Sequence, residues 1–365
     1  MTPVDLSTTV LRAVRRAVRE DALRVPVPAR VRVERTRPGG RGEYASAVAL
    51  QLAGPAGIGA REVAAILRDR LTGTPGVAGV EITGPGFLNF TLDAGAGAAA
   101  HRDLVHRVRA EGERYGWSDA LAGHPARLHH AHEVRAAVTA DAVRRLLHTQ
   151  GAPVHLSHDG GAPDPAWQRL GVSPDAYGRP EAEAAAQAAA TPVRPVPAGH
   201  TAAELLRRLG PDATRWGLLR PAGHDHAPLG PELIVQTAAN PLFRVRYAHA
   251  RARAQRRGAD RLGLTAAAPG EDIDTTGAAP LLTLLDAHPA VLAAAARQHA
   301  PDRLARHLEA LAGAFFDFHD AAPPLPAGEE KPSAAHRSRL AIAEAAGTVL
   351  AGGLTLLGVS APEHL

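Results

Sequence analysis

The sequence of 365 residues predicts three fold classes in succession: an α+β N-terminal domain, a vestigial α/β segment and an all-α C-terminal helical bundle. Short strand-like apolar runs alternate with amphipathic helices at the N-terminal end, whereas only helical apolar spacing occurs after Thr201. Between these regions, proline, glycine and alanine dominate residues 152–200, a composition typical of a linker or a collapsed remnant. We therefore expect domains over residues 1–115, 116–200 and 201–365.

The first domain begins with an amphipathic helix predicted over residues 5–22, where Leu11, Val14 and Val18 recur at helical spacing. The opposite side of this helix carries Arg12, Arg15, Arg16 and Arg19. The further expected elements are a strand at VRVE (31–34), a turn at 38–42, helices at EYASAVALQLA (43–53) and REVAAILRDRL (61–71), strands at VAGVEI (77–82) and GFLNFTL (86–92), and a helix over 94–113.

The C-terminal region has the apolar periodicity of helices throughout. Leu304, Leu308, Leu311 and Phe315, for example, recur on one helical face, which indicates a bundle core. The expected helices cover 201–209, 212–219, 231–257, 279–298, 302–320 and 333–357, with one short helix at EAEAAAQAAA (181–190) before them.

Composition excludes several kinds of chemistry. Cysteine is absent, so the chain has no disulfide framework, thiolate nucleophile or cysteine metal cluster. Lys331 is the only lysine, which excludes chemistry that needs two lysines and leaves arginine as the main source of positive charge. The formal net charge of +4 suits an anionic partner.

No apolar run in the sequence approaches the roughly 20 residues needed to span a bilayer. The N-terminus also lacks the apolar block of a signal peptide. We therefore expect a cytoplasmic protein with no membrane partner.

A cluster of histidines lies within LHHAHEVRAAVTADAVRRLLHTQG (128–151), directly before a helical segment. Metal ligands on one helical face need a separation of three or four residues, and within the cluster only His129 and Glu133 are four apart, without a third ligand nearby. This spacing disfavours a metal site. A solvated helix N-terminus is the simplest alternative, and a third interpretation depends on a family resemblance of the flanking segments.

Two N-terminal segments resemble the additional N-terminal domain of arginyl-tRNA synthetases. GEYASAVALQLA (42–53) is similar to the family's Gly-Asp-Tyr-Ala-(Ser/Thr)-Asn-Val-Ala-Leu, and GPGFLNF (84–90) is similar to its Gly-Pro-Gly-Phe-(Ile/Leu)-Asn-Phe. In that family, this domain approaches the elbow of tRNA. The resemblance implies that Phe87, Asn89 and Phe90 lie near the elbow contacts.

Three C-terminal segments resemble the DALR anticodon-binding domain of the same synthetases. GPDATRWGLLR (210–220) is similar to the Gly-Ala-Asp-Ala-(Ile/Leu)-Arg signature, with Thr214 in place of the aliphatic residue. NPLFRVRYAHAR (240–251) is similar to Asn-Pro-(Val/Leu)-Tyr-Tyr-Val-Gln-Tyr-Ala-His-Ala-Arg, and LLGVSAPEHL (356–365) is similar to the family's chain end. The resemblance implies an anticodon-binding bundle.

The segment from 240 to 257 predicts a basic ridge. Arg246, Arg253 and Arg257 are seven and four residues apart and so lie close in angle on one helix face, while Tyr247 and Arg251 are one turn apart. Such a ridge can neutralise phosphates and stack an unpaired base, although a solvated face with the tyrosine packed inside is the alternative. With the family resemblance, the expected tRNA-binding residues here are Arg244, Arg246, Tyr247, Arg251, Arg253 and Leu365.

The histidine cluster resembles a degenerate form of the family's first catalytic motif. In that register, His130 takes the first histidine position, His132 replaces a glycine and Glu133 replaces the second histidine. The family's histidines donate to ATP phosphates and its glycine admits the adenine, so both replacements oppose ATP binding. The expected KMSK-type loop retains only Arg194 as a cation, and residues 152–200 are too short for the remaining catalytic domain. We expect no catalytic residue and no cofactor.

The leading hypothesis is therefore a noncatalytic arginyl-tRNA synthetase paralogue, which binds arginine-type tRNA through its terminal domains and works with a separate enzyme. A second hypothesis is a tRNA-dependent aminoacyl transfer or accessory role in specialised metabolism, in which a histidine of the cluster is a general base. A third is a protein-interaction module that has lost RNA binding. Family membership alone would instead suggest an arginine–tRNA ligase that binds ATP.

Overall fold

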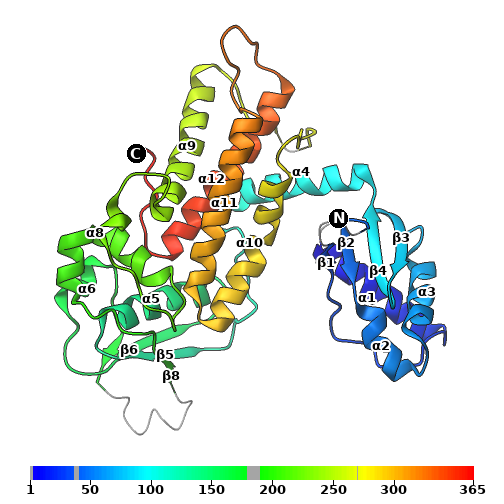
Figure 1. The fold of residues 1–365 in the computed structure, drawn as a ribbon, viewed down its shortest axis with the longest axis horizontal. Coiled ribbons are helices and arrows are strands. Elements are labelled where there is room, and N and C mark those ends of the chain that lie inside the picture. Colours follow the sequence, from blue (N-terminus) through cyan, green and yellow to red (C-terminus); the bar gives the residue numbers. More distant parts are fainter. Residues whose placement is uncertain (1–2, 37–40, 179–189, 269) are drawn as a thin grey trace. The chain divides into compact units, whose positions relative to one another are not determined.

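The computed structural model describes residues 3–36, 41–178, 190–268 and 270–365 (Figure 1). The chain forms two compact units, Met1–Asp103 (unit 1) and Leu104–Leu365 (unit 2). The sequence placed domain boundaries near 115 and 200. The second of these lies inside unit 2, because the α/β segment and the C-terminal helices share one apolar core.

Unit 1 is an antiparallel sheet packed against helices. Its strands lie in the order β1-β2-β4-β3, with α3 against β3 and β4, and α1 against α3. Apolar side chains of all three helices and the sheet form its core. The elements are α1 (Pro3–Arg19), β1 (Glu34–Arg35), β2 (Tyr44–Ser46), α2 (Val48–Ala56), α3 (Ala60–Leu71), β3 (Val77–Thr83) and β4 (Phe87–Leu92).

The predicted helix over 43–53 is wrong at its N-terminal end. Tyr44 to Ser46 form strand β2, which pairs with β4, and the helix begins only at Val48. Tyr44 and Ser46 are buried while Ala45 between them is partly exposed, the alternation of a strand. The sheet thus determines the local conformation. The strand predicted at 31–34 is likewise displaced and contains only Glu34 and Arg35.

The GPGF turn between β3 and β4 requires its second glycine. Gly86 has a φ of +138°, and a Cβ atom there would lie 2.8 Å from the carbonyl oxygen of Ala60. Any side chain would therefore separate the turn from the start of α3. The glycine also brings Phe87 to the first position of β4.

Unit 2 contains a parallel sheet in the region predicted as a linker. The strand order is β7-β6-β5-β8, and α5 packs on β5 and β6 (Figure 1). The elements are α4 (Ala94–Glu111, which crosses from unit 1), η1 (Gly112–Arg114), β5 (Ala126–His130), α5 (Val134–His148), β6 (Val154–His158), α6 (Pro165–Arg169), β7 (Ala176–Tyr177) and β8 (Thr191–Val193). The vestigial α/β segment is therefore folded in its described part. The helix predicted at 181–190 falls almost wholly outside the described residues.

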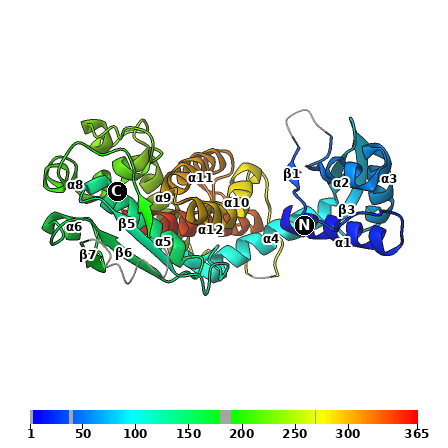
Figure 2. The ribbon, with the colours of Figure 1, turned by 90° about the horizontal axis from the view of Figure 1, so that it is seen from below.

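The remaining helices form the C-terminal bundle, in which α9, α11 and α12 pack side by side (Figures 1 and 2). Their bounds are α8 (Ala202–Leu219), η2 (Pro231–Ile234), α9 (Pro241–Arg261), α10 (Ala279–Gln298), α11 (Pro301–Ala321) and α12 (Ala334–Leu356). Non-helical backbone at Gly210 kinks α8, close to the break predicted between residues 209 and 212. The all-α architecture predicted for this region is confirmed.

The helix predicted over 231–257 is wrong in its first part. Asn240 ends an irregular stretch and caps α9, because its side chain accepts a hydrogen bond from the backbone N–H of Leu242 at 3.0 Å. Its Nδ2 donates to the carbonyl oxygens of Leu233 and Val235, both at 2.9 Å. Pro241 at the first helical position favours a new start there.

The sequence predicted no apolar segment long enough to span a membrane, whereas two helices of the fold reach that length. By length and composition alone, α10 and α12 could cross a membrane, with mean hydropathies of 1.4 and 1.2. Within the fold, 78% of the apolar window of α12 is buried, as expected of a central core helix. Helix α10 packs along α11.

Histidine cluster and candidate RNA surfaces

Glu133 occupies the N-terminus of the helix that follows the histidine cluster. One carboxylate oxygen accepts a hydrogen bond from the backbone N–H of Ala136 at 2.8 Å, which caps α5. The other accepts from the N–H of Ala198 at 3.0 Å, across the turn that leads from β8 to α8. The positive end of the α5 dipole therefore already has an anionic partner from the chain itself.

His130 is not part of a solvated helix end, because only 1% of it is exposed. Its Nδ1 donates to the carbonyl oxygen of Ala131 at 2.8 Å, and Nδ1 of His158 donates to that of Asp159 at 2.7 Å. The Nε2 atoms of both rings are buried without a hydrogen-bond partner among the described residues. Burial lowers the pKa of His130 to about 4 and lowers that of His158, so both rings are neutral near pH 7 and Nε2 carries a lone pair.

Aromatic rings surround these two histidines. His130 stacks on His158 with a centroid separation of 5.5 Å, and Trp167 from α6 contacts both rings. The exposed His132 lies against Trp167, with centroids 4.8 Å apart. His132 thus fills space beside the end of β5 where the family motif has a glycine.

His129 precedes His130 in β5, so its side chain lies on the opposite face of the strand, where it has two polar neighbours. Nδ1 lies 2.8 Å from Ser157 Oγ, and Nε2 lies 3.1 Å from Asp159 Oδ1. Its pairing with Glu133 considered for a metal does not form, since that carboxylate caps α5. Across the described parts of the chain, no group of three or more histidine or carboxylate side chains could hold a metal ion.

Residues 191–200, where the family resemblance places a KMSK-type loop, are tied to the fold by hydrogen bonds to their backbone atoms. Val196 donates through its N–H to the carbonyl oxygen of Gly223 at 2.7 Å, and its own carbonyl accepts from Arg135 at 2.9 Å. Arg194 is exposed. Together with the hydrogen bond from Ala198 to Glu133, these contacts hold residues 191–200 against the start of α5.

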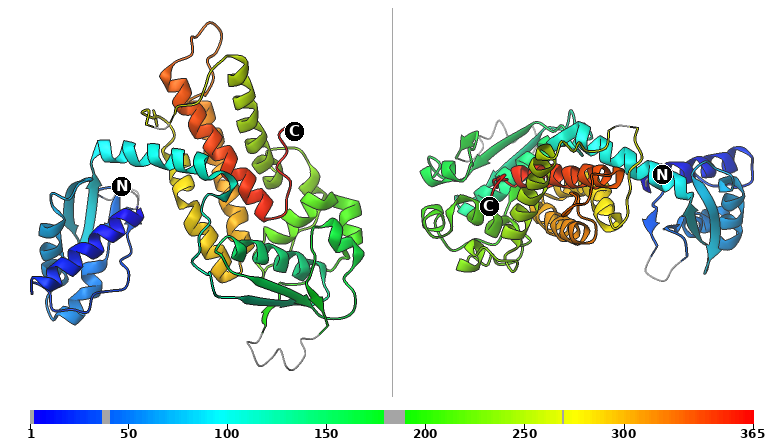
Figure 3. Two further views of the ribbon diagram at one scale, coloured as in Figure 1. Left: turned by 180° about the vertical axis from the view of Figure 1, so that it is seen from behind. Right: turned by 90° about the horizontal axis from the view of Figure 1, so that it is seen from above.

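The five arginines of α9 that the sequence analysis singled out divide into two groups. Arg246, Arg253 and Arg257, the predicted ridge, face the end of the chain, which runs beside α9 (Figure 3). Arg253 pairs with Glu363, and Arg257 donates to the carbonyl oxygen of Glu363 at 3.2 Å. This ridge is thus largely engaged with the C-terminal tail, residues 360–365.

The other group remains open to solvent. Arg244 and Arg251 are exposed, and Tyr247 between them is 38% exposed. The ring of Tyr247 stacks against Phe243 at 5.5 Å and Phe316 at 5.6 Å between centroids. We call Arg244, Tyr247, Arg251 and the two phenylalanines the aromatic platform. The four-residue spacing of Phe243 and Tyr247 indicates part of this platform from the sequence alone. Phe316 lies far away in the chain and joins the platform only through tertiary packing.

Leu365, at the end of the chain, lies near the same helix. It is 53% exposed and lines a cavity of about 220 Å³ together with Phe243, Arg246 and Val235. The structure therefore brings Leu365 into the neighbourhood of two α9 residues.

In unit 1, only one of the three predicted elbow residues is accessible. Phe87 is 38% exposed and lines a cavity of about 580 Å³ with Arg32 and Gln51. The side chain of Asn89 is buried and donates to Thr83 Oγ1 at 2.6 Å. Phe90 is completely buried in the core and has no surface to offer RNA. Gln51 and Arg32 are candidates that the sequence did not single out.

These features define a class of protein: a relative of the aminoacyl-tRNA synthetases with tRNA-binding domains at both ends. Residues 6–92 match the Arginyl tRNA synthetase N terminal domain, and residues 245–365 match the DALR anticodon binding domain. The chain belongs to the arginyl-tRNA synthetase family.

Curated relatives and solved structures agree with this assignment. The arginine–tRNA ligase of Renibacterium salmoninarum is 29% identical over 555 residues, and that of Pseudarthrobacter chlorophenolicus is 27% identical over 558 residues, each with 100% of both chains covered. Arginyl-tRNA synthetase from Thermus thermophilus has a TM-score of 0.67 at 14% identity, covering 100% of both chains. The Plasmodium falciparum enzyme has a TM-score of 0.68 at 9% identity, covering 100% of this chain and 99% of its own. The structural likenesses indicate the fold.

Proposed function

We propose that this chain binds arginine-type tRNA through its two terminal domains, does not activate arginine, and acts in the cytoplasm as a carrier, regulator or partner of a separate enzyme. The observation that carries the proposal is the double hydrogen bond of Glu133, to Ala136 and to Ala198. A carboxylate at this position competes directly with a phosphate for the N-terminus of α5.

The charges around the histidine cluster also oppose the binding of ATP. A polyphosphate that approaches α5 would meet the negative charge of Glu133 in a partly buried setting, where like charges repel strongly. His130 offers no proton in compensation, because its Nδ1–H is used by Ala131 and its Nε2 is unprotonated. His132 adds bulk against Trp167.

Chain length supports the same conclusion. The alignment with the Renibacterium salmoninarum ligase extends over 555 residues, whereas this chain has 365. The parallel sheet is correspondingly small and ends with β8, shortly before α8. An adenylate-forming site would have to be built from this remnant.

The tRNA-binding half of the proposal rests on the surfaces that stay open. The aromatic platform of α9 combines two exposed arginines with a tyrosine ring, a combination suited to phosphates and an unpaired base. The cavity beside Phe87 offers a second aromatic surface in unit 1.

Two measurements on the full chain test the proposal. Arginine-dependent exchange of pyrophosphate into ATP should stay at background, and a rate clearly above a buffer control would refute the noncatalytic assignment. Binding of an arginine tRNA transcript should weaken steeply with salt, because phosphate neutralisation releases counterions. Equal affinity for an unrelated tRNA would remove the arginine-type specificity, and an absence of tRNA binding would leave the protein-interaction alternative.

A second candidate function is favoured by the contacts of His129. Its ring lies between a hydroxyl and a carboxylate, Ser157 Oγ and Asp159 Oδ1, an arrangement that suits a general base in a tRNA-dependent transfer. Replacement of His129 by alanine should then abolish product formation from charged tRNA, while His155→Ala on the neighbouring strand should not. If both variants keep full yield, His129 has no such role.

A further inference from the structure

Helix α1 has one face in the core of unit 1 and a strongly basic face outside it. Leu6, Val10, Val14 and Ala17 are fully buried, which orients the helix unambiguously. Figure 3 shows α1 in dark blue beside the other helices of unit 1. The basic face contains Arg12, Arg15, Arg16 and Arg19, all exposed.

The arginines on this face differ in their pairing. Arg16 donates to Glu20 at 2.7 Å, and Glu20 is shared with Arg70. For Arg12, Arg15 and Arg19, no carboxylate partner exists among the residues that the structure describes. Asp21, the next acidic residue along the chain, is engaged by Arg24 at 2.8 Å. Three adjacent cations therefore lack local neutralisation.

The spacing of the three free arginines suits a linear polyanion. Successive positions 12, 15 and 19 are three and four residues apart and lie within one side of the helix. They span about 10 Å along its axis, at 1.5 Å per residue. Each guanidinium can hold a phosphate through two parallel hydrogen bonds.

We propose that Arg12, Arg15 and Arg19 form a phosphate-backbone docking site for RNA on unit 1, separate from the cavity beside Phe87 and from the aromatic platform of unit 2. This inference rests on the proposed tRNA binding. The site contacts phosphates rather than bases, so it contributes affinity and salt dependence but no sequence preference.

The charge and apolar pattern of α1 favour RNA over an anionic membrane. A helix that lies in a membrane interface needs an exposed apolar face. In α1, the apolar residues Leu6, Val10 and Val14 are all turned into the core of unit 1, so the exposed side has arginine charge without an apolar surface to insert.

The test uses the full chain with Arg12, Arg15 and Arg19 all changed to glutamine, which is a good helix former and keeps the aliphatic stem. The matched control changes Arg24, Arg41 and Arg68 to glutamine, because each of these is ion-paired within unit 1 and the loss of charge is equal. Affinity for an arginine tRNA transcript is measured over a range of salt concentrations for wild type and both variants, after circular dichroism has established equal helix content.

We expect the α1 variant to bind the transcript roughly tenfold or more weakly at moderate salt, with the slope of log affinity against log salt reduced by about two to three. The control should change the slope by less than one. An α1 variant that matches the control overturns the docking site even when wild type binds tRNA, whereas a wild type without tRNA affinity overturns the proposed function first. Binding of wild type to phosphatidylserine vesicles, lost in the α1 variant while tRNA affinity is unchanged, would assign the face to membranes and contradict the proposal.

Discussion

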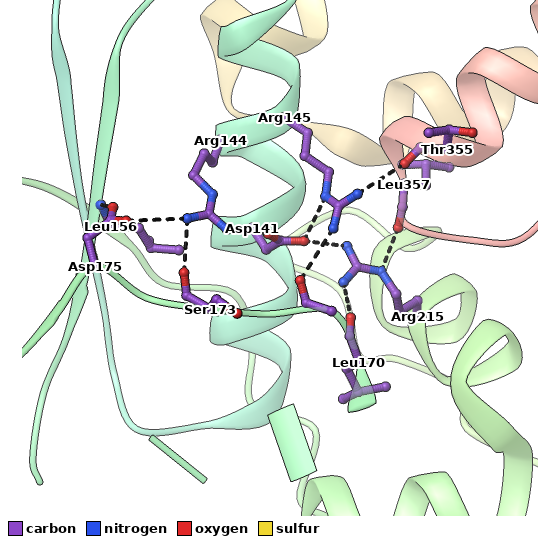
Figure 4. A network of polar contacts seen from close by, with 11 residues as sticks. Asp141, Arg144, Arg145, Leu156, Leu170, Ser173, Asp175, Arg215, Thr355 and Leu357 are labelled. Atoms are coloured by element: carbon purple, nitrogen blue, oxygen red, sulfur yellow. Dashed lines mark hydrogen bonds and ion pairs between the residues drawn. The ribbon is translucent and has the colours of Figure 1, made fainter. Parts of the chain in front are cut away.

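Asp141 on α5 and Arg215 on α8 form a buried ion pair, in which Asp141 Oδ2 accepts a hydrogen bond from a terminal guanidinium nitrogen at 2.8 Å (Figure 4). Arg215 also donates to the carbonyl oxygens of Leu357, after α12, and Leu170, after α6. One side chain thus joins the α/β segment to the start and the end of the helical bundle. Arg215 is the arginine of the DALR-like signature, and its partner lies on α5, the helix that follows the histidine cluster.

Removal of the carboxylate of Asp141 should strongly destabilise unit 2. Burial by itself would raise the pKa of Asp141, but the charges of Arg215, Arg145 and Arg144 outweigh burial and lower it. Asp141→Ala leaves the Arg215 guanidinium buried without its counterion, at a cost of about 3–5 kcal/mol in the free energy of unfolding. Urea denaturation followed by tryptophan fluorescence, to which the buried Trp167 and Trp216 contribute, measures this loss.

Arg145→Gln is the control for this prediction. Arg145 contacts the same carboxylate at 2.9 Å, but its side chain is one-third exposed, so its loss should cost about 1 kcal/mol or less. Equal effects of the two substitutions would contradict the central role of the buried pair.

A pair of buried histidines should make the bundle sensitive to acid. Burial lowers the pKa of His288 to about 3 and that of His307 to about 4, and their rings lie 5.2 Å apart between α10 and α11. Because the folded pKa values are below the ordinary value of about 6.5, the unfolded chain binds more protons between these limits. The associated stability is complete above pH 6.5 and falls by a few kcal/mol as the pH drops through 4.

The variant His307→Gln should flatten this pH dependence, measured as the free energy of unfolding at several pH values between 7 and 4. The control His224→Gln replaces a histidine with an exposed side chain and should leave the slope as in wild type. A slope that is unchanged in His307→Gln would show that other groups cause the acid sensitivity.

Glu133 should also contribute to the stability of unit 2. Glu133→Ala removes the cap of α5 and the contact with Ala198, and we expect a loss of about 1–2 kcal/mol. The melting temperature should fall accordingly, while Asp320→Ala, a substitution of a highly exposed carboxylate in the same unit, should leave it within error. A thermally neutral Glu133→Ala would mean that the cap is dispensable.

Within unit 2, the aromatic platform should bind RNA through stacking. Tyr247→Leu keeps an apolar side chain but removes the base-stacking ring, and we expect a loss of about 1–3 kcal/mol in binding an arginine tRNA transcript. Arg253→Gln is the comparison, because this arginine is paired with Glu363 and should change affinity less than Arg251→Gln. If Arg253→Gln weakens RNA binding more than Arg251→Gln does, RNA must displace the C-terminal tail from Arg253.

The helical bundle was predictable because its apolar residues recur locally. Leu304, Leu308, Leu311 and Phe315 are all buried on the inner side of α11. Strand β2 was not predictable in this way. Its three residues, Tyr44 to Ser46, are too few to show an alternating pattern, and they owe their conformation to pairing with β4. Within the predicted α/β segment, β7 and β8 were missed for the same reason, since they have only two and three residues.

The family and its two terminal domains were recognisable from residue identities in their order along the chain. The packing of the folded chain determines which of the candidate residues are accessible to RNA. Burial removed Phe90 from the predicted RNA surface, and the C-terminal tail engaged Arg253, while Tyr247 stayed open. Helical spacing places residues on a common face, but what covers that face comes from segments far away in the chain, and these meet only when the chain folds.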